Sequence, residues 1–177
     1  MIVIVAGIAG SGKTTVGALL AGRLGWMFAD ADAFHPPANV EKMRSGEPLT
    51  DEDRLPWLRA IIAWMDERAT AGQSGVITCS ALKRSYRAML LDGRPAAEMV
   101  FLEVDAEVLL QRVSGRPDHF FPRKLLESKL AALEQPSPAE EPRVRAIAEV
   151  GGAQETADKI MALLWPSGAP GGEPGGA

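Results

Sequence analysis

The sequence has few features that mark secreted, membrane-spanning or nucleic-acid-binding proteins. Its 177 residues include one cysteine, Cys79, which cannot form an internal disulfide and, lying in an apolar run, is interpreted as a buried structural thiol rather than a nucleophile. The net charge is −4, which gives no general attraction to nucleic acid. No apolar run is long enough to span a membrane, and no basic segment precedes the first apolar run. These absences predict a cytoplasmic protein whose partners include neither nucleic acid nor membrane.

Apolar segments and helical patterns alternate along most of the chain. Hydrophobic residues make up 46% of the composition, which suits one domain with a proper core. Strands are predicted at residues 2–6, 26–32, 75–80, 99–104 and 144–150, and helices at 13–24, 40–44, 51–71, 82–91, 125–133 and 156–164. This order predicts a three-layer α/β/α fold around a parallel five-stranded sheet, in a single domain over residues 1–166. Residues 167–177 form a Gly/Pro-rich tail that we expect to be disordered.

A glycine-rich segment follows the first strand and opens the first helix. It fits the phosphate-binding pattern G-x-x-x-x-G-K-[ST], the P-loop, in the order Gly7, Ile8, Ala9, Gly10, Ser11, Gly12, Lys13, Thr14, with Thr15 next. Glycines let successive N–H groups turn inward around a polyphosphate, and the helix dipole adds positive potential. Lys13 can reach the β- and γ-phosphates and the Thr14 hydroxyl can ligate Mg²⁺. The segment predicts binding of ATP with Mg²⁺, against the alternative of a plain glycine-rich turn.

Two carboxylates lie at the C-terminal end of the second strand, at the sheet edge where the P-loop lies. Asp30 and Asp32 suit support of a metal ion and acceptance of a proton from an attacking hydroxyl. The alternative is a turn with a helix-capping aspartate, which the adjoining P-loop disfavours. Asp105, after the fourth strand, resembles a metal-binding carboxylate but better fits a helix N-cap. The third strand ends in Ser80 rather than in an acidic pair, which argues against a motor ATPase.

Basic residues gather in three places, and solvated helix faces are the ordinary interpretation of such charges. They are Lys42, Arg44 and Arg54; Lys83, Arg84 and Arg87; and Arg112, Arg116, Arg123 and Lys124. The third group surrounds Gly115, Pro117 and the aromatic run His119–Phe121, a composition suited to a loop that closes over a nucleotide. His35, just after Asp32, is compatible equally with substrate binding and with capping of a turn.

Several segments together resemble the small P-loop gluconate kinases, which are related to shikimate and nucleoside-monophosphate kinases. Beside the P-loop they are D-A-D-A-F-H, N-V-E-K-M-R-S-G-E-P-L-T-D-E-D-R-L-P-W-L, C-S-A-L-K-R-S-Y-R, H-F-F and L-E-Q-P, and the match covers about residues 2–165. Such kinases often carry D-G-D where this chain has Asp30-Ala31-Asp32. The resemblance implies ATP-dependent phosphorylation of D-gluconate at its 6-hydroxyl, with a homodimer as a further expectation.

The resemblance also implies roles for individual residues. Lys13, Asp32 and Arg116 would act in catalysis, and Thr14 and Asp30 would support Mg²⁺. The substrate ligands would be Asp32, His35, Arg54, Lys83, Arg87 and His119, with residues 36–72 as a substrate-side helical region. Residues 112–124 would form the lid, where Arg112 stacks on adenine, and Gln154 would lie near the base. The alternatives are another small-metabolite kinase, such as a shikimate kinase, and a regulatory nucleotide-binding module without turnover.

Overall fold

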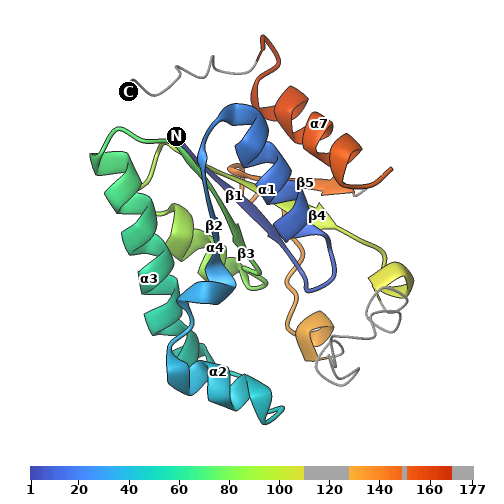
Figure 1. Cartoon of the computed structure of the whole chain (residues 1–177). Helices are drawn as coiled ribbons and strands as arrows, with labels where there is room; N and C mark the ends of the chain where they lie inside the picture. The colour runs from blue at the N-terminus through green and yellow to red at the C-terminus, as the bar shows by residue number, and fades with distance from the viewer. Residues whose placement is uncertain (110–127, 149–150, 169–177) are drawn as a thin grey trace.

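The computed structural model describes residues 1–109, 128–148 and 151–168. Its elements are β1 (Ile2–Gly7), α1 (Lys13–Leu24), β2 (Met27–Asp30), a 3₁₀ turn (Ala31–Phe34), α2 (Pro37–Arg44), α3 (Asp51–Thr70), β3 (Gly75–Cys79), α4 (Arg84–Leu91), β4 (Ala97–Glu103), β5 (Val144–Ala148) and α7 (Ala153–Leu164) (Figure 1). Residues 106–109 and 128–131 are also helical. Within the described residues, no helix is both long and apolar enough to cross a membrane.

The five strands form one parallel sheet in the order β2-β3-β1-β4-β5. β1 lies in the centre, where Ala6 pairs with Cys79 of β3 and with Phe101 of β4. Both faces of β1 are buried, as its unbroken β-branched run predicts. The carboxyl ends of all five strands therefore meet at one edge of the sheet, and α2 lies beyond that edge (Figure 1).

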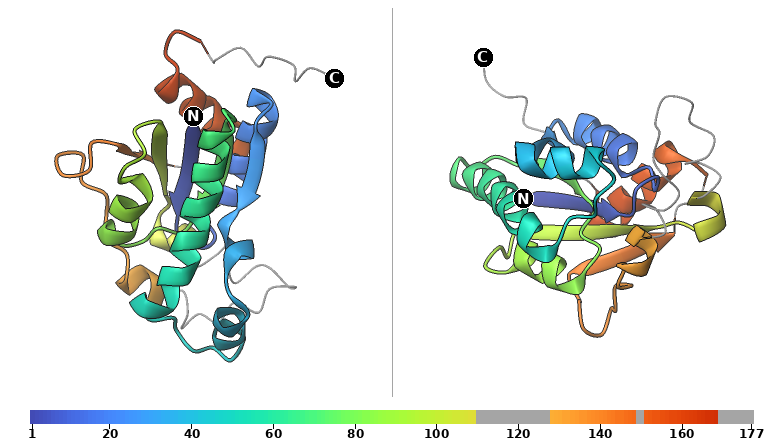
Figure 2. Two further views of the ribbon diagram at one scale, coloured as in Figure 1. Left: turned by 90° about the vertical axis from the view of Figure 1, so that its left-hand side faces the viewer. Right: turned by 90° about the horizontal axis from the view of Figure 1, so that it is seen from below.

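Helices cover both faces of the sheet. On one face, Ile2, Ile4 and Ala6 pack with the buried stripe of α3 and with α4. On the other, Val3 and Val5 pack with α1 and with Ile160 of α7. Figure 2 shows α3 running alongside the strands. The predicted three-layer α/β/α fold with a five-stranded parallel sheet is confirmed.

The long helix α3 begins as its sequence predicts. The Thr50 hydroxyl accepts a hydrogen bond from the Asp53 N–H at 3.2 Å, and the Asp53 carboxylate accepts one from the Thr50 N–H at 2.8 Å, which makes a complete capping box. Lys42 of α2 adds an ion pair to Asp53 at 2.9 Å, and together these contacts lower the Asp53 pKa to about 2. Pro56 lies inside α3 and has no N–H, so the hydrogen bond that a residue at this position would donate to the Glu52 carbonyl is missing.

Several predicted boundaries are wrong by a few residues. β2 ends at Asp30, so Asp32 lies in the 3₁₀ turn rather than on the strand. The cause is local, because the Asp30 carboxylate accepts a hydrogen bond from the Asp32 N–H at 3.1 Å and thereby caps the turn. α2 begins earlier than predicted, at Pro37, which suits a first helical position. The predicted lid at 112–124 lies outside the described residues, as does the tail beyond residue 168.

Candidate active site

The loop between β1 and α1 is shaped as a phosphate cradle. Gly10 and Gly12 have φ values of +86° and +80°, and Gly7 has +149°, a region that side chains rarely adopt. A methyl group on Gly7 would meet the Ser11 hydroxyl at 2.7 Å. Ser11 is fully buried, and its hydroxyl has no hydrogen-bond partner among the described residues. A tightly folded loop with an unsatisfied buried hydroxyl suits a site that receives polar ligand atoms.

The start of α1 adds the donors and the charge that an anion requires. In the described part of the chain no side chain caps this helix, and its first turn carries no acidic residue. Its opening N–H groups and the positive end of its dipole therefore face the loop. Lys13 is the first residue of the helix and is partly buried. Ile8 packs with Leu82 and Leu109, which fixes the loop against the rest of the sheet edge.

A hydroxyl and a carboxylate meet beside the cradle. The Thr14 hydroxyl donates to the Asp30 carboxylate at 2.9 Å, while the other oxygen of Asp30 caps the 3₁₀ turn. Hydroxyl and carboxylate oxygens are the hard ligands that Mg²⁺ prefers, and Mg²⁺ usually takes only one or two protein ligands beside water and phosphate. The donor set therefore fits the predicted ion. Among the described residues, no group of three or more His, Cys, Asp or Glu side chains is placed to hold a metal ion.

A short turn presents Asp32 and His35 at the same edge. Asp32 is exposed, and the His35 ring stacks on Trp57 of α3 with centroids 4.6 Å apart and planes 7° apart. The buried Trp57 indole N–H donates to the Ala31 carbonyl at 2.7 Å, so α3 holds the turn from beneath. Burial lowers the His35 pKa, and the nearby cations Lys129 and Arg54 lower it further, against the opposing charge of Asp32. His35 is therefore poised as a neutral hydrogen-bonding group.

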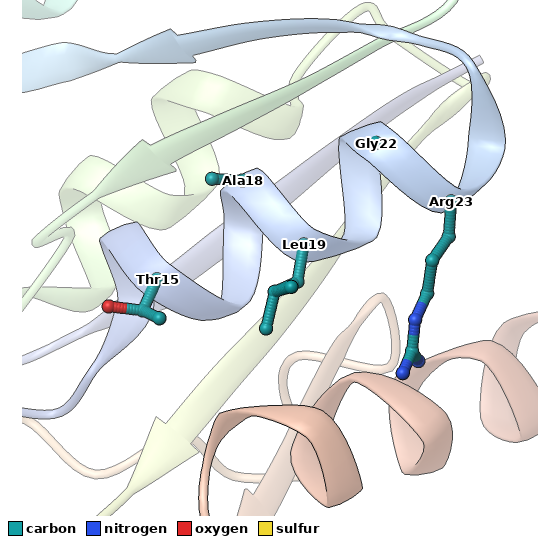
Figure 3. A pocket seen from close by; sticks show the side chains of 5 residues that line it. All are labelled: Thr15, Ala18, Leu19, Gly22 and Arg23. Carbon is teal, nitrogen blue, oxygen red and sulfur yellow. The ribbon is translucent and has the colours of Figure 1, made fainter.

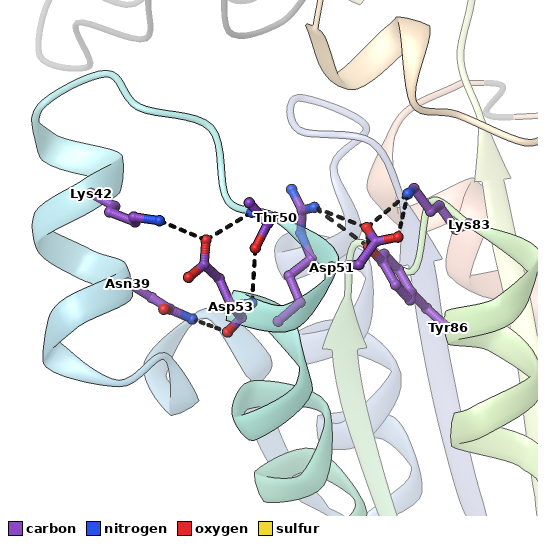
Figure 4. A network of polar contacts seen from close by, with 8 residues as sticks. Asn39, Lys42, Thr50, Asp51, Asp53, Lys83 and Tyr86 are labelled. Carbon is purple, nitrogen blue, oxygen red and sulfur yellow. Dashed lines mark hydrogen bonds and ion pairs between the residues drawn. The ribbon is translucent and has the colours of Figure 1, made fainter.

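A polar network joins the start of α3 to α4 (Figure 4). Lys83 donates to the two carboxylate oxygens of Asp51 at 2.7 and 2.8 Å, and the Tyr86 hydroxyl donates to the same carboxylate. Arg54 lies 3.9 Å from Asp51 and 3.5 Å from the Tyr86 hydroxyl, which are long contacts for a guanidinium. Arg54 is thus held loosely beside the acceptor side of the edge, whereas Lys83 is already engaged.

Arg87 is placed differently from the sequence-based expectation. Its side chain is fully buried, and its guanidinium makes a two-point ion pair with Glu141 at 2.7 and 2.8 Å. Its remaining nitrogen donates to the carbonyls of Ala81 and Leu82 at 3.2 and 3.0 Å. The structure therefore contradicts a direct contact of Arg87 with substrate, because its donors are used within the protein. Its role is to hold the chain that follows β3, where Ala81 adopts a left-handed φ of +39°.

Two residues of the site edge were missed by the sequence analysis. Lys129 lies close enough to Lys13, Asp32 and Arg54 for their charges to act on it, and its pKa is lowered, first by burial. Glu134 accepts a hydrogen bond from the Arg84 N–H at 2.6 Å and so caps α4, while its own N–H donates to the Leu82 carbonyl at 3.0 Å. Both follow the predicted lid in sequence, and no local pattern indicates where they fold back.

Three predicted site residues, Arg112, Arg116 and His119, lie outside the described residues. Gln154 lies in the first turn of α7, where its amide oxygen accepts a hydrogen bond from Arg23 at 2.6 Å. Arg23 also pairs with Asp158 at 2.7 Å, so it joins α1 to α7. Figure 3 shows the hollow beside these helices, lined by Thr15, Ala18, Leu19, Gly22 and Arg23. A contact of Gln154 with adenine stays a prediction.

The structure distinguishes between the alternatives for two further residues. Cys79 is buried at the end of β3, and burial raises its pKa to about 12, which confirms a structural thiol. The Asp105 carboxylate accepts a hydrogen bond from the Glu107 N–H at 2.8 Å, which confirms an N-cap.

Comparison with known proteins agrees with this geometry. The family model for shikimate kinase matches residues 9–163, and the chain belongs to this family of P-loop kinases, which transfer phosphate to a hydroxyl. Within the family, the chain is 49% identical over 146 residues to the gluconokinase of Gluconobacter oxydans, with 82% of each protein covered. At that identity and coverage, it groups with the gluconokinases.

Solved structures agree with this grouping. A crystal structure of a sugar kinase from Janibacter sp. superposes with a TM-score of 0.82 at 46% identity, covering 96% of this chain and 95% of the other. A gluconokinase structure from Sinorhizobium meliloti gives a TM-score of 0.77 at 38% identity, covering 93% and 96%. The likeness therefore extends over nearly the whole chain and is not confined to the P-loop.

Proposed function

We propose that the protein transfers the γ-phosphoryl group of ATP to the 6-hydroxyl of D-gluconate, giving 6-phosphogluconate and ADP. The observation that carries the proposal is that one sheet edge joins a phosphate cradle to an exposed carboxylate, Asp32, with Arg54 and Lys83 on the facing helices. A sugar acid needs a cation for its carboxylate and polar groups for its hydroxyls, and this edge offers both. The gluconokinases among the relatives support the same substrate.

The P-loop side holds the donor. The glycine-rich loop and the start of α1 bind the phosphates through backbone N–H groups, and Lys13 places its charge on the β- and γ-phosphates. Thr14 and Asp30 would hold Mg²⁺, which supplies positive charge against the phosphate oxygens. Because these groups are fixed before substrate arrives, they stabilise developing charge at little cost of reorganisation.

Asp32 is the acceptor for the proton of the reacting hydroxyl. Its carboxylate accepts this proton as the O6–phosphorus bond forms and the bond to the β-phosphate oxygen breaks, so that ADP leaves. The stacked His35 offers a hydrogen bond to a sugar hydroxyl. Arg54, which lacks a close ion pair among the described residues, suits the gluconate carboxylate. Arg116 and His119 complete the site from the predicted lid, and Arg112 stacks on adenine.

A coupled assay of ADP release tests the proposal. We expect Mg²⁺-dependent ADP release with D-gluconate that exceeds the rate with other sugar acids and with shikimate. The second candidate is phosphorylation of shikimate, which the family model favours, since shikimate also carries a carboxylate and hydroxyls. Faster turnover of shikimate than of gluconate would replace the first proposal with the second.

The proposal excludes a module that binds nucleotide without turnover. Asp32→Asn is expected to leave ATP affinity almost unchanged, while turnover falls by roughly 10² or more, because the proton acceptor is lost. Equal turnover in this variant would remove that role from Asp32. A cytoplasmic location and a homodimer also belong to the proposal, and light scattering of the purified protein tests the dimer.

A further inference from the structure

The network around Asp51 contains an acidic group on the cationic side of the site. Asp51 is the first residue of α3, and its side chain stays 60% exposed although three donors converge on it. Lys83 engages both oxygens, Tyr86 donates to one of them, and Arg54 lies 3.9 Å away (Figure 4). The carboxylate is therefore held in one orientation while much of it remains open to solvent.

The Asp51 carboxylate keeps more hydrogen-bonding capacity than an ion pair that only joins two helices would need. A carboxylate has about four acceptor positions on its two oxygens, and among the described residues the Oδ2 oxygen of Asp51 accepts a hydrogen bond from Lys83 alone. Hydrogen bonds from Lys83 and Tyr86 lower the Asp51 pKa, so the group is ionised across the physiological range. An ionised, oriented and exposed carboxylate is a strong acceptor for hydroxyl groups.

The surroundings determine which ligand groups suit it. A negatively charged group in direct contact with the Asp51 carboxylate would be repelled, whereas a hydroxyl can donate to Asp51 and accept from Lys83 at once. Arg54 lies next to Asp51. The charge of Arg54 also acts on His35 and Lys129, and the charge of Asp32 acts on the same two residues. Asp51 is thus adjacent to Arg54, the proposed ligand of the gluconate carboxylate.

We propose that Asp51 is a substrate-binding and specificity-determining residue, which with Lys83 binds a secondary hydroxyl of the sugar-acid chain. The inference rests on the proposed function, because it assigns a part of the same acceptor site. In this role, Asp51 selects polyhydroxy acids over acids that lack a hydroxyl at the matching carbon. When a substrate without that hydroxyl binds, the Asp51–Lys83 pair loses hydrogen bonds to water and gains none from the substrate.

The test measures kcat/KM for D-gluconate and for its 2-deoxy, 3-deoxy and 4-deoxy analogues with three proteins. For the unchanged protein, we expect one deoxy analogue to be about 10- to 100-fold poorer than gluconate, as for loss of a hydrogen bond to a charged group. In Asp51→Asn that penalty should shrink to about 3-fold or less, as the charged acceptor is gone. Asp66→Asn is the matched control, since Asp66 also lies on α3, is 53% exposed and pairs with Arg94 at 2.7 Å. The control should keep the full penalty.

The possible results distinguish a failure of the role given to Asp51 from a failure of the proposed function. If no deoxy analogue is penalised, or if Asp51→Asn retains the same penalty while losing activity equally toward every substrate, Asp51 has only a structural role and the inference is wrong. If the unchanged protein releases no ADP with gluconate, the proposed function itself has failed. Calorimetric titration of gluconate into each protein gives a second readout, in which Asp51→Asn should weaken binding of gluconate more than of the penalised analogue. Asp51→Ser replaces Asp51→Asn if thermal melting shows the latter to be unfolded.

Discussion

Replacement of the buried Arg87 by methionine should destabilise the protein strongly. The arginine is fully buried, and its partner Glu141 has only 8% of its side chain exposed. Arg87→Met leaves the Glu141 carboxylate and the carbonyls of Ala81 and Leu82 without the donors they have now. Removal of one partner of a buried ion pair costs about 3–5 kcal/mol. For a domain of this size, that corresponds to a fall in Tm of about 6–20 °C.

A neighbouring pair on the same helix provides the control. Arg84 pairs with Glu140 at 2.7 Å, but the two side chains are 50% and 57% exposed. Arg84→Met should therefore cost no more than about 1 kcal/mol, since solvent screens exposed pairs. Arg87→Met combined with Glu141→Gln should cost less than Arg87→Met alone, because no buried charge is then left unpaired.

Thermal and urea unfolding followed by circular dichroism measures the three variants. A stabilising role of the buried pair is refuted if Arg87→Met lowers the free energy of unfolding no more than Arg84→Met does. It is also refuted if the added Glu141→Gln change makes Arg87→Met still less stable, because the unpaired carboxylate would then not be the source of the cost.

Three further predictions concern the site and its support. Lys13→Met should impair phosphoryl transfer, because a charge on the β- and γ-phosphates is lost, and a steady-state assay with a normal rate would contradict the assignment. Cys79 should resist thiol reagents in the native protein at pH 8 and react in urea, because burial raises its pKa to about 12; rapid native labelling would argue against this. The folded-state pKa of Asp53 lies at about 2, below its ordinary value of 3.8, so its stabilising effect is present above pH 4 and lost as pH falls toward 2. Acid titration of stability should accordingly be shallower in Asp53→Asn, and an unchanged profile would refute the role of Lys42 and the capping box.

Features encoded in neighbouring residues were predictable from the sequence. The P-loop follows from a short pattern between a strand and a helix, and the capping box of α3 follows from Thr50 and Asp53 at their required spacing. The parallel sheet follows from the alternation of strands and helices. In each case, the relevant interactions span only a few residues or repeat along the chain.

Features that depend on distant partners were not predictable in the same way. From the sequence alone, Arg87 is expected to be a surface cation. The fold pairs it instead with Glu141, which lies 54 residues later in the chain. Asp51 looks like an ordinary helix-start carboxylate until Lys83, 32 residues later, engages it. Asp32 leaves the strand because of a hydrogen bond to Asp30, which competes with strand pairing through a single side chain. Composition and periodicity carry no information on such pairings.

The 6-hydroxyl of gluconate is the proposed acceptor of the phosphoryl group. Phosphorus NMR of a reaction of the protein with ATP, Mg²⁺ and D-gluconate tests this directly, because coupling to the methylene protons at carbon 6 identifies the ester. We expect a single new phosphomonoester coupled to those two protons, which appears as ADP forms. Absence of a phosphomonoester, or a phosphate attached to another carbon of the chain, would contradict the proposal.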